Sequence, residues 1–144
     1  MPHRAKQILD AIESALSSNT DLGATVEVNR VGSLAEDQGE LPALTVNYSD
    51  LPDAESDMRS WHRVLDIVLT AYTAGESESE VTAALFELQR QAHISMVTEY
   101  GLTFVWETSL GEIAAPQIQQ ADRTIGALTS RWFVRYIMNI SDPG

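Results

Sequence analysis

The amino-acid sequence predicts an α+β fold, with one mostly antiparallel β-sheet of four to five strands and two helices packed on one face. Two observations lead to this prediction. Along the chain, the patterns follow the order helix, two or three strands, helix, two strands. The closing stretch, residues 126–140, alternates apolar and polar side chains over its whole length, which predicts a long strand that needs partner strands. A length of 144 residues predicts a single domain, residues 1–144.

The first half of the chain predicts one helix and two strands. Residues 3–18 repeat apolar side chains at i, i+3, i+4 and i+7, as an amphipathic helix with one core-facing stripe does. Residues 25–31 and 41–48 alternate with a period of two and predict strands. Between them, residues 32–40 form a polar stretch that predicts a loop. Residues 50–57 predict a mobile acidic loop after the second strand.

Residues 58–72 fit either a helix or a strand. A helix would place Trp61 and Leu65 in one stripe. A strand would place the same two residues on one face together with Arg59 and Arg63. The stretch is rich in β-branched residues, which favours the strand.

The second half of the chain predicts another helix and two more strands. Ser77 and Glu80 have the spacing of a capping box and predict the start of a helix that ends near Met96. Residues 102–110 alternate apolar and polar side chains and predict a strand. The stretch 113–125 is rich in glutamine and predicts an irregular connection to the closing strand.

The two faces of the closing strand differ. Every second residue from Leu128 to Ile140 is apolar except Ser130, and we expect this row to lie beneath the helices. The opposite row contains Phe133 and Ile137 among polar residues and is only half polar. A face of this kind favours cover by another chain, because a solvated sheet face has little need for a large aromatic residue.

Composition narrows the classes of function. The formal net charge is −12, from 21 acidic and 9 basic residues, which argues against tight binding to duplex DNA. There is no cysteine, so disulfides and thiolate chemistry are excluded. No apolar run reaches about 18 residues, so no membrane span is predicted. The first residues lack the apolar core of a signal peptide, and we expect the chain to be cytoplasmic when made.

We expect no metal, no cofactor and no catalytic activity. An acidic run from Asp53 to Asp57 resembles the first half of an EF-hand loop, but Met58 replaces the required glycine and Val64 the closing glutamate. No nucleophile elbow, P-loop or dinucleotide-binding glycine motif occurs. The histidines do not have the spacing of a metal site: they are His3, His62 and His93.

Arginines near aromatic residues are the remaining candidates for a site. Together they could form a stacking platform for single-stranded nucleic acid, but the acidic balance favours buried tryptophans and arginines at a protein interface. In that interpretation the arginines meet carboxylates of a neighbouring subunit, from the stretch 36–57, which holds seven acidic residues and no basic one. Replacing Arg131 and Arg135 by Glu is then expected to separate folded subunits. The candidate interface residues are Arg131, Phe133, Arg135, Arg59 and Arg63.

Three local features resemble the siphophage tail terminator proteins of the minor tail protein U type. The stretch Glu40–Tyr48, ELPALTVNY, is similar to their LPAL-strand-Tyr segment. The closing strand with its Val134-x-Tyr136 core, followed by Asp142-Pro143, is similar to their last strand. The N-terminal helix followed by a short strand also agrees. The resemblance extends over most of the chain in layout, although residues 113–125 have no counterpart, and related head-tail completion proteins are similar at this level.

The resemblance implies a structural virion protein without enzymatic activity or cofactor. Such a protein is made in the host cytoplasm and forms a hexameric ring at the head-proximal end of the tail. The ring ends polymerisation of the tail tube protein and joins it to a head completion or connector protein, while DNA passes through without tight binding. Alternatives are a head-tail completion (neck) protein, a phage-derived adaptor, and a small-molecule binding module or enzyme that uses the half-polar sheet face as a pocket floor.

Overall fold

The structure is a computed structural model that describes residues 3–28, 42–53, 60–98, 100–120, 122–139 and 141–144. These residues form two helices, α1 (Arg4–Ser18) and α2 (Glu78–Met96), and six strands. The strands are β1 (Thr25–Val28), β2 (Ala43–Pro52), β3 (Ser60–Gly75), β4 (Val105–Ile113), β5 (Gln117–Gln120) and β6 (Thr124–Asn139). This is the α+β fold that the sequence predicts.

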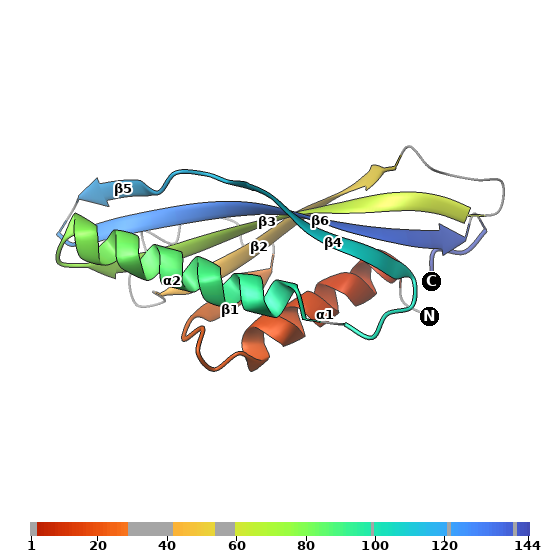
Figure 1. Ribbon diagram of the computed structural model, residues 1–144, viewed down its shortest axis with the longest axis horizontal. Helices are drawn as coiled ribbons and strands as arrows, with labels where there is room; N and C mark the ends of the chain where they lie inside the picture. The colour runs from red at the N-terminus through yellow and green to blue at the C-terminus, as the bar shows by residue number, and fades with distance from the viewer. Residues whose placement is uncertain (1–2, 29–41, 54–59, 99, 121, 140) are drawn as a thin grey trace.

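The six strands form one sheet in the order β1-β2-β3-β6-β4, and β5 also pairs with β6. The β1–β2 pair is parallel and all other pairs are antiparallel, so the sheet is mixed but mostly antiparallel. Strands β3 and β6 pair without interruption from Ser60↔Asn139 to Gly75↔Thr124 and run the length of the molecule (Figure 1). Both helices lie on one side of this sheet (Figure 1).

The helices begin where the sequence provides caps. At α1, the His3 side chain accepts a hydrogen bond from the Ala5 amide. At α2, the Ser77 hydroxyl accepts a hydrogen bond from the Glu80 amide at 3.2 Å, as a capping box requires. The Glu80 carboxylate in turn accepts one from the Glu76 amide at 3.3 Å. Each helix then turns its apolar stripe toward the sheet.

The core lies between the helices and one face of β6. Trp132 is 1% exposed, and its ring packs edge-to-face with the His93 ring of α2, with 5.2 Å between the two ring centroids. The indole N–H of Trp132 donates to the hydroxyl of Ser130 at 3.2 Å, which explains the one polar residue in the apolar row. The predicted row is buried as expected, with Ile140 outside the described residues: Leu128, Ser130, Trp132, Val134, Tyr136 and Met138.

Helix α2 packs directly on β6 at Gly126. A Cβ added there would lie 2.5 Å from Val81 Cγ1 and 2.9 Å from Leu85 Cδ1. Only a residue without a side chain leaves room for this contact, because real Cβ atoms do not approach other atoms so closely.

Several boundaries differ from those predicted. The ambiguous stretch 58–72 is a strand where the structure describes it, and it continues to Gly75 as β3. Strand β2 extends to Pro52, so the predicted acidic loop is wrong for its first three residues, which pair with Arg63–Leu65 of β3. The predicted irregular connection 113–125 is also wrong in part, because β5 pairs with the start of β6.

The remaining predicted elements end differently or fall outside the described residues. The predicted strand 102–110 is β4, which begins at Val105 and continues to Ile113. The predicted strand 25–31 is β1 as far as Val28, and its last three residues lie outside the described part of the chain. The predicted loop 32–40 and residues 54–57 of the acidic loop lie outside the described part of the chain.

Candidate subunit interface

Three of the five candidate interface residues lie together on the face of the sheet opposite the helices, which we call the outer face. Arg131, Phe133 and Arg135 alternate on β6 with the buried row, so they point to the outer face. Arg63 lies on the helix-facing side, because it is directly opposite buried Tyr136. Arg59 lies outside the described residues.

Arg131 is ion-paired within the subunit. Its Nε lies 2.9 Å from Oδ1 and 3.1 Å from Oδ2 of Asp66, a residue of the neighbouring strand β3. Asp66 is 4% exposed, whereas half of the Arg131 side chain is in solvent. The hydrogen bonds and charge of Asp66 raise the pKa of Arg131 above its usual value. The buried carboxylate therefore has its countercharge in the same chain.

Arg135 lies between two carboxylates of the same subunit. Its Nε donates to Glu107 Oε2 at 3.1 Å, and its Nη1 lies 3.6 Å from Asp53 Oδ2. Glu107 is directly opposite Arg135 on β4, and Asp53 follows β2. The predicted partner from the stretch 36–57 is thus present, but within the subunit. Whether a neighbouring copy adds further carboxylates stays a prediction.

Phe133 also has contacts within the subunit. A Cβ at Gly111 of β4 would lie 2.7 Å from Phe133 Cε2, so the ring packs directly on that glycine. The guanidinium carbon of Arg131 lies 5.8 Å from the ring centroid, within the range of a cation–π contact. The aromatic ring on this face is therefore half-buried by its own sheet, and its outer surface remains available to a partner.

Asp66 is the functional residue that the sequence interpretation missed. It lies inside the apolar run Val64–Leu69, in the middle of a long strand. A carboxylate at such a position needs a partner, since an unpaired buried charge is strongly unfavourable. The sequence therefore indicated that Asp66 has a cationic partner. It did not identify Arg131 as that partner, because the pairing depends on the register between β3 and β6.

Arg63 belongs to a polar cluster on the helix-facing side of the sheet. Its Nη2 lies 3.4 Å from Asp50 Oδ2 and 3.4 Å from the Asp50 carbonyl oxygen. The fully buried Tyr136 is directly opposite Arg63 on β6. Burial raises the pKa of Tyr136, and the negative charge of Asp50 adds to the effect. This arrangement makes Arg63 a structural residue of the subunit.

We expect the protein to lose stability above about pH 10 because of two tyrosines, the buried Tyr136 and the partly buried Tyr100. Burial raises the pKa of Tyr136 and also that of Tyr100, whose hydroxyl donates to the Met96 carbonyl at 2.6 Å. Their stabilising contribution is complete below the unfolded pKa of about 10 and is lost as the pH rises toward the higher folded values. Urea unfolding at several alkaline pH values should show this loss, and Tyr136→Phe and Tyr100→Phe should each reduce its steepness. An unchanged pH dependence in both variants would contradict the assignment.

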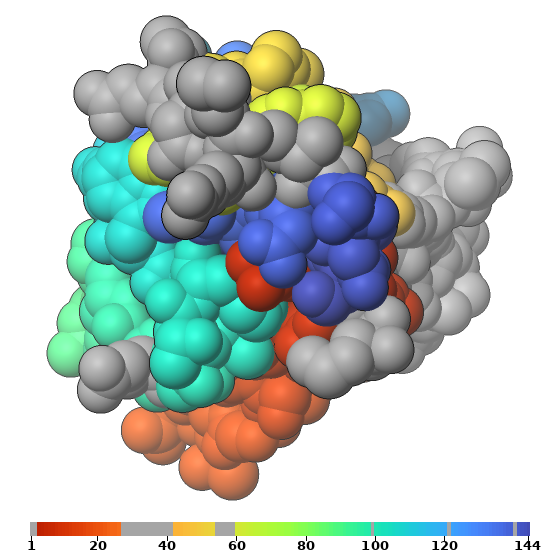
Figure 2. All heavy atoms as spheres, turned by 90° about the vertical axis from the view of Figure 1, so that its right-hand side faces the viewer, coloured from red at the N-terminus to blue at the C-terminus, as the bar shows by residue number. Residues whose placement is uncertain are grey.

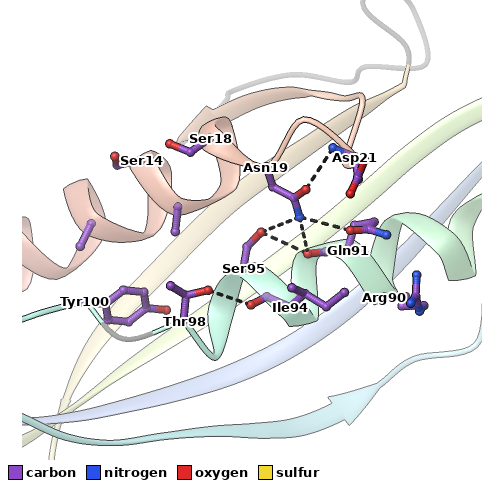
Figure 3. Close-up of a pocket in the computed structure, with 12 residues that line it drawn as sticks. Ser14, Ser18, Asn19, Asp21, Arg90, Gln91, Ile94, Ser95, Thr98 and Tyr100 are labelled. Atoms are coloured by element: carbon purple, nitrogen blue, oxygen red, sulfur yellow. Dashed lines mark hydrogen bonds between the residues drawn. The ribbon is translucent and has the colours of Figure 1, made fainter.

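A groove of about 720 Å³ lies between α1 and α2 (Figure 3). At its centre, the Asn19 amide nitrogen donates to the Gln91 carbonyl at 3.2 Å and to Ser95 Oγ at 3.1 Å. The Asn19 side-chain oxygen accepts from the Asp21 amide, and Gln91 Nε2 donates to Glu87. These polar groups form hydrogen bonds with one another, so the network holds the end of α1 against α2. It offers less to a small-molecule ligand than a pocket whose polar groups converge on empty space.

Asn19→Ala is expected to lower the free energy of unfolding by about 1–3 kcal/mol. The substitution removes the donor that Gln91 and Ser95 share, and both of these partners are buried. Urea denaturation should measure the loss. Ser18→Ala, an exposed position in the same groove, is the matched control and should change the value by less than about 0.5 kcal/mol. Equal losses in the two variants would contradict a fastening role for Asn19.

Two observations limit other kinds of site. In the part of the chain that the structure describes, no group of three or more histidine, aspartate or glutamate side chains lies where it could hold a metal ion. Neither described helix has the length and apolar character to cross a membrane.

In comparisons with known proteins, no protein-family model matches the sequence, and no curated protein matches it.

Proposed function

We propose that this chain is a structural virion protein of the siphophage tail terminator kind. It forms a ring, hexameric as in the family it resembles, at the head-proximal end of the tail tube. The ring ends tube polymerisation and offers a joining surface to the head. The observation that carries the proposal is the outer face of the sheet, where both described arginines are ion-paired within the subunit although the chain has a net charge of −12.

A surface whose charges neutralise one another favours the assembly of copies that otherwise repel one another through their net negative charge. Like charges at a contact cost several kcal/mol, so strongly acidic subunits meet best where local charge is already neutralised. On the outer face, Asp66 neutralises Arg131, and Asp53 and Glu107 neutralise Arg135. Burying this face against another protein therefore adds little electrostatic repulsion.

Exposed apolar residues beside these ion pairs support the same role. Trp106 on β4 is 48% exposed and lies 6.4 Å from the His62 ring, centroid to centroid. Leu51 on β2 is 45% exposed. Large apolar side chains next to arginines are the composition that protein interfaces favour. A surface of this kind suits the tail tube protein or the head connector as partner.

The cationic side chains support a ring that lets DNA pass. Within the described part of the chain, five of them are paired with carboxylates of the same subunit, which leaves less positive charge for phosphates. A channel built from such subunits repels DNA or leaves it mobile. The paired residues are Lys6, Arg63, Arg90, Arg131 and Arg135.

We expect the protein to bind duplex DNA with a dissociation constant above about 10⁻⁶ M at physiological salt. The reason is the acidic charge together with the intramolecular pairing of the arginines. Fluorescence anisotropy of a labelled duplex, titrated with the protein at several salt concentrations, measures this. Tighter binding that weakens steeply with salt would show a phosphate-binding surface and count against the proposal.

A tube-growth experiment tests the function itself. A tail tube protein encoded by a neighbouring gene is allowed to polymerise with and without this protein, and tube lengths are measured by electron microscopy. The proposal expects tubes that stop growing and carry this protein at one end. Heat-unfolded protein is the control and should leave growth unchanged. Tubes of equal length with and without the folded protein would contradict the proposal.

A further inference from the structure

Helix α1 begins with a histidine cap. The Nδ1 atom of His3 accepts a hydrogen bond from the Ala5 amide at 3.1 Å, and the His3 carbonyl accepts the first bond inside the helix, from the Gln7 amide at 3.0 Å. The first amides of a helix have no partners inside it, so this side chain supplies one of the missing acceptors. Serine, threonine, aspartate and asparagine usually take this role, and none of them titrates between pH 5 and 8 as histidine does.

The capped turn holds distant parts of the chain together. The Arg4 amide donates to the Pro143 carbonyl at 2.8 Å, which joins the start of α1 to the C-terminal segment, residues 141–144. The Arg4 guanidinium donates to the Ile137 carbonyl near the end of β6 and lies 4.9 Å from the centroid of the Phe104 ring, just before β4. Figure 2 shows this junction, with the start of α1 in red between the C-terminal residues in blue and the chain before β4 in cyan. Loss of helical geometry at Arg4 therefore loosens three contacts together.

Only the neutral form of His3 can cap the helix in this way. In a neutral imidazole one ring nitrogen is an acceptor and the other carries a hydrogen, whereas both nitrogens of the protonated ring are donors. When Nδ1 of His3 gains a proton, two donors face each other and the bond from the Ala5 amide is lost. Histidine side chains take up this proton as the pH falls from about 8 to about 5.

The charges around His3 also disfavour its protonated form. The amino end of a helix carries partial positive charge, and the first turn of α1 contains no acidic residue. The charged side chains of that turn are both positive, those of Arg4 and Lys6. In the adjoining C-terminal segment, the carboxylate of Asp142 already accepts a hydrogen bond from the Gly144 amide at 2.9 Å. The neighbouring parts of β6 and of the chain before β4 contribute the uncharged Ile137 and Phe104.

We infer that His3 is a pH-sensitive cap, which holds the start of α1 against the C-terminal segment at neutral pH and releases this junction as the pH falls toward 5. The folded first turn is bonded to the neutral imidazole, so proton uptake opposes its formation and its stability falls with falling pH. This inference needs neither a second copy nor another partner, and it goes beyond the proposed function.

The expected change is local. The end of a helix opens at a small cost compared with global unfolding, so the loss of one capping bond changes the open population measurably. Removal of a side-chain cap shifts such an equilibrium by about 2- to 30-fold. The long β3–β6 pair does not depend on the cap, because its strands are bonded to each other over their whole length.

Amide hydrogen exchange, measured by NMR at pH 8 and pH 5 below the concentration of assembly, tests the inference. Each exchange rate is divided by the rate of an unstructured peptide at the same pH, so that the ratio reports protection by structure. In the wild type, protection of the Ala5 and Arg4 amides should fall by about 2- to 30-fold from pH 8 to pH 5. Amides in the middle of β6 should show no comparable change.

Three substitutions separate the cap from other effects of pH. His3→Asn keeps a good capping side chain that does not titrate, so protection of the Ala5 and Arg4 amides should be the same at both pH values. His3→Ala should lower protection at both pH values. His62→Gln removes a histidine of β3 and should keep the wild-type response.

Two results would overturn the cap itself: equal protection of the Ala5 amide at both pH values in the wild type, or an equal fall in His3→Asn. A fall at the Ala5 amide without one at the Arg4 amide would show that the cap titrates but does not control the junction, and would contradict the release of the C-terminal segment.

Discussion

The Trp132→Ala variant is expected to lose about 3–5 kcal/mol of the free energy of unfolding. Trp132 is 1% exposed, in the centre of the longest strand pair, where it contacts the His93 ring of α2 and donates to Ser130. Its removal leaves a cavity between sheet and helix and an unpaired hydroxyl. Because typical domains are stable by only 5–15 kcal/mol, the loss should be visible as a much lower urea midpoint.

Trp106→Ala is the matched control for this prediction. The same substitution at a side chain that is 48% exposed removes about half as much buried area, leaves no enclosed cavity, and should cost about half as much. Both variants are compared by urea denaturation at a concentration below that of assembly. Similar losses in the two variants would mean that the core is not centred on Trp132.

Arg131→Gln is expected to destabilise the subunit more than Arg131→Gln combined with Asp66→Asn. The single change leaves the buried Asp66 carboxylate without its partner, whereas the double change removes the charge as well. The single variant should therefore have the lowest urea midpoint of the set, and the double variant should recover part of the loss. We expect this effect to be second only to that of Trp132→Ala.

A double-mutant cycle measures the coupling between the two residues. Wild type, both single variants and the double variant are unfolded in urea under one set of conditions. Losses that add, with no recovery in the double variant, would show that the two side chains act independently. The interaction between the two side chains would then contribute no coupling energy to the stability of the subunit.

The fold could be predicted from the sequence because its signals are local. The alternation in β6 and the capping box at Ser77 depend on neighbouring residues only, and both elements are present. Strand β5 was missed because Gln117–Gln120 carries no apolar alternation and is a strand through its pairing with β6. The end of β2 was missed for the same reason, since pairing with β3 outweighs the loop-like composition of residues 50–52.

The candidate site could be predicted only in part. Alternation was enough to place Arg131, Phe133 and Arg135 on one face. The partners of the arginines depend on register between strands far apart in sequence, which places Asp66 beside Arg131 and Glu107 opposite Arg135. Replacing both arginines by Glu therefore places like charges side by side within the subunit as well. A loss of assembly in that variant could then result from weaker folding, so the variant does not test the interface alone.

Sedimentation velocity of the wild-type protein over a range of concentrations tests the central claim, self-assembly into a ring, most directly. We predict one discrete species with the mass of a hexamer, whose population rises with concentration and which does not grow into longer polymers. A compact monomer at every concentration would contradict it and would favour a binding module instead.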